Sequence, residues 1–223
     1  MRALRPGLWH WTAPHPDWRP SEPWDQNVSS YAIDDGERLL LFDPIAPPED
    51  LFALAAVRDT AVVLTAPWHE RDMQNLVERL GVLVYAPRPD SAQDLIDKWG
   101  ITAEQAGEGS PDLVWLRAEA ADRWRPYTAD GPLPSGLEGF EGREPNDIVL
   151  WVEGHRAVVS GDTLADFGEG LEVSARWLRP GVTRESRIER LRPLLDKPVE
   201  HVLATHGGPF DRTALERALS FPS

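Results

Sequence analysis

Four apolar runs in this chain lead into an aspartate or a histidine, and this repetition constrains the fold more than any other feature. "RLLLF" is followed by Asp43 and "AVVSG" by Asp162, while "AVVLT" and "VLAT" each precede a polar turn that carries His69 or His206. Apolar runs of this length predict buried strands. Two similar halves that each deliver an Asp and a His at strand ends predict that these four residues lie at one shared edge.

The remaining pattern alternates strands with helices and includes hairpins. Turn chemistry at Asp34-Asp35-Gly36 and at Glu153-Gly154-His155 predicts two hairpins. Strands are predicted at 28–33, 38–42, 61–65, 82–87, 112–116, 147–152, 156–160 and 201–206. Helices are predicted at 47–57, 73–80, 90–100, 183–195 and 211–219, and residues 117–141 read as loop-rich. This order predicts an α+β fold of mixed sheets with helices on the outside.

The N-terminal residues form a segment of distinct composition. Four of the ten Trp fall within the first 24 residues, among several Pro. We interpret residues 1–27 as an irregular arm that packs on a single domain of residues 28–223, with the indoles as apolar anchors. If 9–11 is extended, Trp9 and Trp11 share one face and His10 takes the other. Exposed Trp on this arm is a candidate surface for homo-oligomer formation.

Composition excludes several classes of function. Lys+Arg is 23 and Asp+Glu is 37, and the resulting net charge of -14 disfavours binding to nucleic acid or to an anionic membrane. Cysteine is absent, so a metal ion has only His and carboxylate ligands available. The N-terminus lacks the continuous apolar stretch of a signal peptide, and no run is long enough for a membrane span, so we expect a cytoplasmic protein.

The strand-end motifs together resemble the metallo-β-lactamase superfamily. "NVSSYAIDDGERLLLFDP" is similar to the opening hairpin of that family, and "VVLTAPWHERD" lies where the family has His-x-His-x-Asp-His. "GREPNDIVLW" lies where it has Gly-His-Thr-Pro-Gly before a strand, and "VVSGDTL" and "VLATHGG" match segments with a bridging Asp and a last His ligand. The resemblance implies a four-layer αββα sandwich of two mixed sheets, with the site at one edge between them.

The family pattern is altered at two places. Alignment on Gly142 puts Arg143 where a metal-binding His stands in the family, and a guanidinium cannot be a metal ligand. It offers a planar fork for a carboxylate or phosphate instead. Glu144 is the nearby group that could coordinate in place of the lost His.

The second altered place, residues 66–72, allows two registers. Without a gap, Ala66, Trp68, Glu70 and Arg71 take the motif positions; three ligand-type residues are then lost, and Glu70 replaces the Asp conservatively. With one extra residue in the turn, the positions fall on Pro67, His69, Arg71 and Asp72, so that His69 takes the second His position and Asp72 the last. We favour the second register because residues three apart share a face at the start of a helix.

The site prediction follows the second register. His69, Asp72, Asp162 and His206 are predicted to bind one divalent metal ion, with zinc favoured and manganese or iron compatible. Asp162 is also the predicted catalytic residue. The function expected is metal-dependent hydrolysis of a small ester, thioester or related acyl substrate.

Three further side chains are predicted to contact that substrate. Arg143 and Arg71 are predicted to hold an anionic group on it, and Trp68 is the third substrate-binding residue. The alternative is a metal-free binding or assembly module that keeps the fold, which Arg143 in a ligand position favours.

Overall fold

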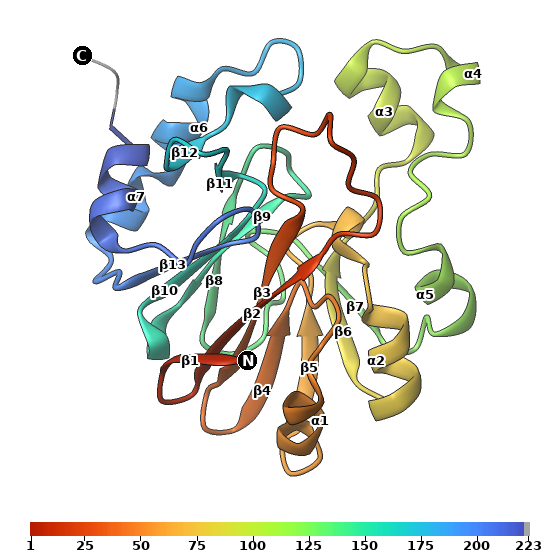
Figure 1. Ribbon diagram of the computed structural model, residues 1–223. Coiled ribbons are helices and arrows are strands. Elements are labelled where there is room, and N and C mark those ends of the chain that lie inside the picture. Colours follow the sequence, from red (N-terminus) through yellow and green to blue (C-terminus); the bar gives the residue numbers. More distant parts are fainter. Residues whose placement is uncertain (221–223) are drawn as a thin grey trace.

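A seven-stranded sheet forms the N-terminal half of the molecule, which a computed structural model describes over residues 1–220 (Figure 1). Its strands are β1 (Arg2–Arg5), β2 (Leu8–Pro14), β3 (Asn27–Asp34), β4 (Arg38–Phe42), β5 (Asp59–Val63), β6 (Leu83–Pro87) and β7 (Trp124–Tyr127). They lie side by side in chain order. Neighbours from β1 to β4 are antiparallel, and those from β4 to β7 are parallel.

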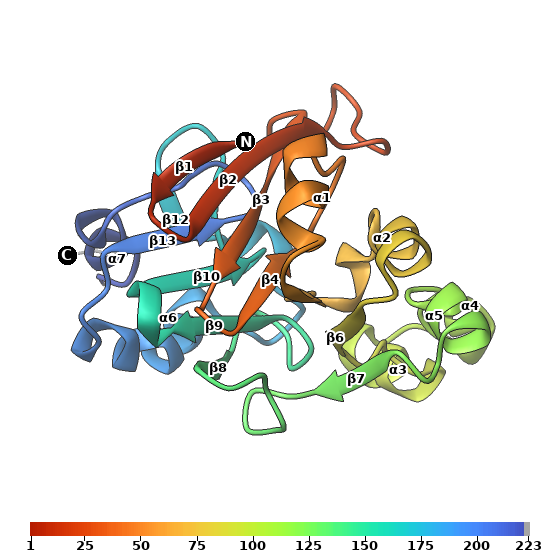
Figure 2. The ribbon, with the colours of Figure 1, turned by 90° about the horizontal axis from the view of Figure 1, so that it is seen from below.

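A second sheet of four strands packs face to face with the first (Figure 2). Its strands are β8 (Leu137–Glu141), β9 (Ile148–Val152), β10 (Ala157–Gly161) and β13 (His201–Ala204), in the order β13-β10-β9-β8. β10 and β13 are parallel, and the other pairs are antiparallel. A short hairpin of β11 (Leu164–Asp166) and β12 (Leu171–Val173) follows β10.

The helices of residues 1–220 are α1 (Glu49–Ala55), α2 (Met73–Leu80), α3 (Ala92–Trp99), α4 (Ala103–Ala106), α5 (Val114–Glu119), α6 (Arg184–Leu191) and α7 (Arg212–Ala218). All except α3 and α4, which pack on each other, cover the outer face of one of the two sheets (Figure 1). Apolar residues of α1, α2 and α5 pack on the seven-stranded sheet, and those of α6 and α7 pack on the four-stranded sheet.

Side-chain alternation along β4 shows how the layers arise from the sequence. Leu39 and Leu41 face the helices, whereas Leu40 and Phe42 face the other sheet. A strand segment that is covered on both faces is apolar throughout, as residues 39–42 ("LLLF") are. Each such side chain contributes roughly 1.5–3 kcal/mol through burial. The predicted αββα sandwich is confirmed.

The N-terminal segment is not the irregular arm that the sequence analysis expected. Residues 2–14 supply two strands of the main sheet, and β2 pairs with β3 along its whole length. Trp11 is buried under the helices with Trp9 beside it, and His10 stacks on Tyr31 from the opposite face. The β-prone, alternating character of 8–14 outweighs its Pro content, so only residues 15–26 form a loop.

The predicted strand at 112–116 is also wrong. Leu113, Leu116 and Ala120 are buried together, and their spacing of three and four is that of a helix. The next strand of the sheet is β7, which lies in the stretch expected to be loop-rich, as does β8. Within residues 1–220, no helix is long and apolar enough to cross a membrane.

Candidate functional site

The strand ends deliver the expected residues to one edge of the sandwich. Asp43 follows β4, and Asp162 follows β10. His69 ends a 3-10 turn (Pro67–His69) just after β5, and His206 comes two residues after β13. All four side chains are buried and form a continuous chain of contacts.

Asp43 forms the base of this cluster. Its Oδ1 accepts a hydrogen bond from the Thr65 backbone N–H at 2.8 Å, and its Oδ2 accepts one from the Thr65 hydroxyl at 2.6 Å. The same Oδ2 lies 3.0 Å from Nδ1 of His69. Asp43 therefore fixes both the end of β5 and the orientation of the imidazole.

Asp162 is the centre of the site. Its Oδ1 lies 3.1 Å from Nε2 of His69 and 3.2 Å from Nε2 of His206. Its Oδ2 accepts the indole N–H of Trp68 at 2.8 Å and lies 3.3 Å from Nη2 of Arg143. Both oxygens of this carboxylate are thus already engaged by protein groups.

Arg143 joins the two halves of the site. Its Nε lies 3.0 Å from Oδ2 of the fully buried Asp147, and its Nη1 donates to the Trp177 carbonyl at 3.0 Å. The guanidinium carbon sits 4.7 Å from the centroid of the Trp68 ring. The fork that the sequence suggested for a ligand anion is therefore used within the protein, on Asp147 and Asp162.

The 66–72 segment follows neither register completely. Trp68 and His69 both reach Asp162. Arg71 points to the same edge and donates from Nη1 to the Asp43 carbonyl at 2.9 Å. Glu70 turns away and accepts the Leu113 backbone N–H. Asp72 accepts the Ala46 N–H and does not line the site pocket, so the structure does not bring it to the other predicted ligands.

The backbone geometry of this segment explains why neither register holds completely. The 3-10 turn packs three residues per turn, so successive side chains point in different directions from those of an α-helix. Arg71 then adopts a φ of 41°, a left-handed conformation that is unfavourable for a side chain of this size. Such a residue marks a functional constraint in many sites.

His206 and three indoles surround a pocket of about 270 Å³ above Asp162. Trp24 and Trp177 contact the His206 ring edge-on at centroid distances of 4.7 and 5.2 Å. The third indole is that of Trp68, and His15, His69, Arg71 and Arg143 complete the wall. The loop after β2 thus supplies His15 and Trp24 to the pocket.

The histidines of the site differ in charge. Burial alone would lower the pKa of His69, but the carboxylates of Asp43 and Asp162 outweigh it and raise that pKa to about 9. Burial lowers the pKa of His206 despite its contact with Asp162. At neutral pH the first imidazole is therefore a cation and the second is neutral.

The two carboxylates beside Arg143 are also shifted. Burial favours the protonated form of Asp162, but His69, His206 and Arg143 hold its pKa well below the ordinary value. Burial raises the pKa of Asp147 to about 7, although Arg143 opposes the shift. The site thus contains three carboxyl groups, those of Asp43, Asp147 and Asp162. It also contains three cationic side chains, those of Arg71, Arg143 and protonated His69.

The site does not fit the divalent ion that the resemblance implies. Among residues 1–220, no group of three or more His, Asp or Glu side chains is arranged to hold a metal ion. The central carboxylate already receives hydrogen bonds on both oxygens, and a fixed guanidinium lies beside it. A cation added there meets repulsion from Arg143 and Arg71.

Glu144 does not enter the site either. Its carboxylate is buried and pairs with Nζ of Lys98 at 3.3 Å and with Nε of Arg179 at 3.6 Å. These contacts fix the loop that carries Arg143. Glu144 is therefore a structural residue and not a replacement ligand.

Several residues of the site escaped the sequence reasoning. The sequence shows Asp147 only as the first residue of a predicted apolar strand, and Trp177 lies in a stretch without a recognisable motif. Neither observation indicates a role in the site. His15 could have been suspected, since it lies in the Trp-rich segment. No local pattern indicates that a Trp next to a His donates to a carboxylate 94 residues further along the chain.

Comparison with solved structures identifies the fold. The structure of a metallo-β-lactamase from Erythrobacter litoralis, with β-mercaptoethanol in its active site, matches with a TM-score of 0.63 and 14% identity over 98% of this chain and 93% of that chain. The metallo-β-lactamase family protein TTHA1429 from Thermus thermophilus gives 0.57 and 17% identity over 97% and 78%. The di-iron-bound form of TTHA1623 gives 0.54 and 24% identity over 86% and 93%.

These matches span nearly the whole chain, and the sandwich they share is the one described above. No protein-family model and no curated protein sequence matches the chain. The chain has the metallo-β-lactamase fold. Its sequence is 14–24% identical to those of the three structures named above.

Proposed function

We propose that this chain binds a small anionic organic molecule in the pocket above Asp162, without a metal ion. The observation that carries this proposal is the state of the Asp162 carboxylate. Four protein groups already contact its two oxygens: the Trp68 indole, Arg143, His69 and His206. This supports the metal-free alternative over the mononuclear hydrolase, because the carboxylate would have to give up these contacts to bind a metal ion.

Arg71 is the proposed anchor for the anionic group. It lines the pocket, and its Nη1 donates to the Asp43 carbonyl, which leaves Nη2 without a hydrogen-bond partner in the described part of the chain. A charge-assisted hydrogen bond from this group to a ligand carboxylate or phosphate is stronger than one between neutral groups. Its left-handed backbone is the conformation that directs the side chain to this edge.

The pocket walls suit an apolar or aromatic body on the ligand. Trp24, Trp68 and Trp177 present ring surfaces around a volume of about 270 Å³, close to the lower size of small-molecule sites. Neutral His206 pairs through Nε2 with Asp162, so a hydrogen bond orients it at the pocket wall. The predicted contacts of Trp68 and Arg71 with a small molecule are kept in this proposal, and Arg143 becomes the residue that fixes the pocket floor.

A second candidate function is the metal-dependent hydrolase of a small ester or thioester. One observation favours it: Nε2 of His69 and Nε2 of His206 face the same oxygen of Asp162, and Asp43 supports His69 from behind. Carboxylate-backed histidines are common among metal ligands. Metal analysis separates this candidate from the first.

The ligand proposal is tested with benzoate and phenyl phosphate by isothermal titration calorimetry. We expect saturable binding of at least one of them, with affinity reduced roughly tenfold or more in Arg71→Gln because a charge-assisted hydrogen bond is lost. Arg217→Gln, on the exposed face of α7, is the matched control and should bind like the unmodified protein. Equal affinity in Arg71→Gln and Arg217→Gln contradicts Arg71 as the anchor.

A further inference from the structure

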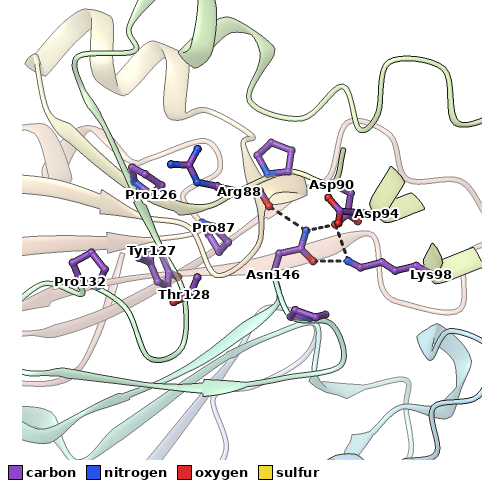
Figure 3. Close-up of a pocket in the computed structure, with 12 residues that line it drawn as sticks. Pro87, Arg88, Asp90, Asp94, Lys98, Pro126, Tyr127, Thr128, Pro132 and Asn146 are labelled. Atoms are coloured by element: carbon purple, nitrogen blue, oxygen red, sulfur yellow. Dashed lines mark hydrogen bonds and ion pairs between the residues drawn. The ribbon is translucent and has the colours of Figure 1, made fainter. Parts of the chain in front are cut away.

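A second pocket, of about 320 Å³, opens where the parallel strands β6 and β7 end (Figure 3). β6 ends in Pro87 and β7 in Tyr127, and both residues line the pocket. Ligands of sheets with parallel strands bind beyond the carboxyl ends of those strands. The position and the volume are therefore those of a small-molecule site.

The walls of this second pocket are rigid. Pro87, Pro126 and Pro132 form one side together with Tyr127 (Figure 3). The Tyr127 hydroxyl donates to the Leu64 carbonyl at 2.6 Å, which fixes the ring. Proline rings and a fixed ring lose little freedom when a ligand binds, so the pocket is preorganised for an apolar body.

The polar end of the pocket is satisfied internally. Asn146 donates to the Arg88 carbonyl at 3.2 Å and to Oδ1 of Asp90 at 3.0 Å. Lys98 donates to the same Asp90 oxygen at 2.7 Å and to Oδ1 of Asn146 at 3.2 Å (Figure 3). These groups have little capacity left for a ligand and act as a fixed end wall.

Arg88 is the exception. It lines the pocket on the side of Pro126, and its guanidinium forms no ion pair with any residue between 1 and 220 (Figure 3). Its recorded partner is the Trp124 ring, 5.4 Å from the guanidinium carbon. Arg88 is exposed, and its guanidinium is therefore free to pair with an anionic group on a ligand in this pocket.

We propose that this proline-walled pocket is a second ligand site, which takes a planar aromatic carboxylate. The ring would lie against Pro87, Pro126 and Tyr127, and the carboxylate would pair with Arg88. A guanidinium recognises a carboxylate through two parallel hydrogen bonds, and it can stay stacked on an indole as it does so.

The second pocket is separate from the site at Asp162, although one loop touches both. Pro145 and Asn146 line the second pocket, whereas Arg143 and Asp147 belong to the first site. The proposal is therefore independent of the function proposed above.

The test is a titration with 2-naphthoate, followed by amide chemical shifts of the whole chain. We expect saturable shifts at Thr128, Asn146 and their neighbours, and roughly tenfold or more weaker binding in Arg88→Gln. Arg88 is exposed, so this variant should keep its fold, which the same spectra verify. Arg125→Gln, an exposed arginine of β7 that does not line the pocket, is the matched control.

Arg71→Gln separates this site from the first one. It should leave the shifts at Thr128 and Asn146 unchanged, even if it abolishes binding near Asp162. The proposal is overturned if 2-naphthoate produces no saturable shift at Thr128 and Asn146. Equal affinity in Arg88→Gln and Arg125→Gln overturns it as well.

Discussion

Replacing Arg143 with Ala is expected to lower the free energy of unfolding by about 3–5 kcal/mol, the usual cost of leaving a buried charge without its partner. The Arg143 side chain is 14% exposed, and it pairs with Asp147 and Asp162, whose side chains are 0% and 9% exposed. Without the guanidinium the pKa of Asp147 rises further, so its carboxyl group takes up a proton at pH 7, and Asp162 loses one of the cations that stabilise its charge. Denaturant-induced unfolding at pH 7 measures the change.

Two variants control for less specific effects. Arg143→Lys keeps the charge but not the planar fork, so it should recover part of the stability. Arg156→Ala breaks a pair with Glu200 in which the side chains are 54% and 44% exposed, and it should cost less than about 1 kcal/mol. If Arg143→Ala lowers the free energy of unfolding no more than Arg156→Ala does, Arg143 does not stabilise the protein through Asp147 and Asp162.

Stability is expected to fall as the pH rises from about 6.5 to about 9. The pKa of His69 is about 9 in the folded protein, above its ordinary value of 6.5. The folded state therefore holds a proton that the unfolded chain releases, and the stabilisation is complete below pH 6.5 and lost as the pH rises through 9. The loss from this group is on the order of 3 kcal/mol.

A neutral side chain at this position isolates the effect. His69→Gln should be less stable than the parent near pH 6.5 and should lose less stability than the parent between pH 7 and 9. Asp147, with its pKa raised to about 7, gives a separate loss between about pH 4 and 7 in the parent, and this loss extends to higher pH in His69→Gln because the His69 cation lowers the pKa of Asp147. A parent whose stability is constant from pH 6.5 to 9 would contradict a protonated His69.

The strand ends could be predicted from the sequence because they follow from burial alone. The residues after Arg38 in "RLLLF" are all apolar because both faces of β4 are covered. Asp43 is the first polar residue after this run. The same reasoning places Asp162 and His206, and the structure brings both into contact. Local patterns of this kind need no knowledge of distant contacts.

The side-chain partners could not be predicted in this way. Whether Arg143 faces solvent or two buried carboxylates depends on the path of the 142–147 loop, in which Gly142 packs against Thr163 and leaves no room for a Cβ atom. The prediction that Asp72 lies in the site assumes α-helical spacing. The 3-10 turn and the left-handed backbone conformation of Arg71 change the directions in which the following side chains point. Spacing rules hold within one type of helix and fail where the type changes.

We propose that cationic side chains hold this site together in place of a metal ion. Elemental analysis by inductively coupled plasma mass spectrometry tests this on protein purified without added metal or chelator. We expect far less than one transition-metal ion per chain, and no increase in melting temperature when zinc, manganese or iron is added. A stoichiometric metal ion that disappears in both His69→Ala and Asp162→Ala would contradict it.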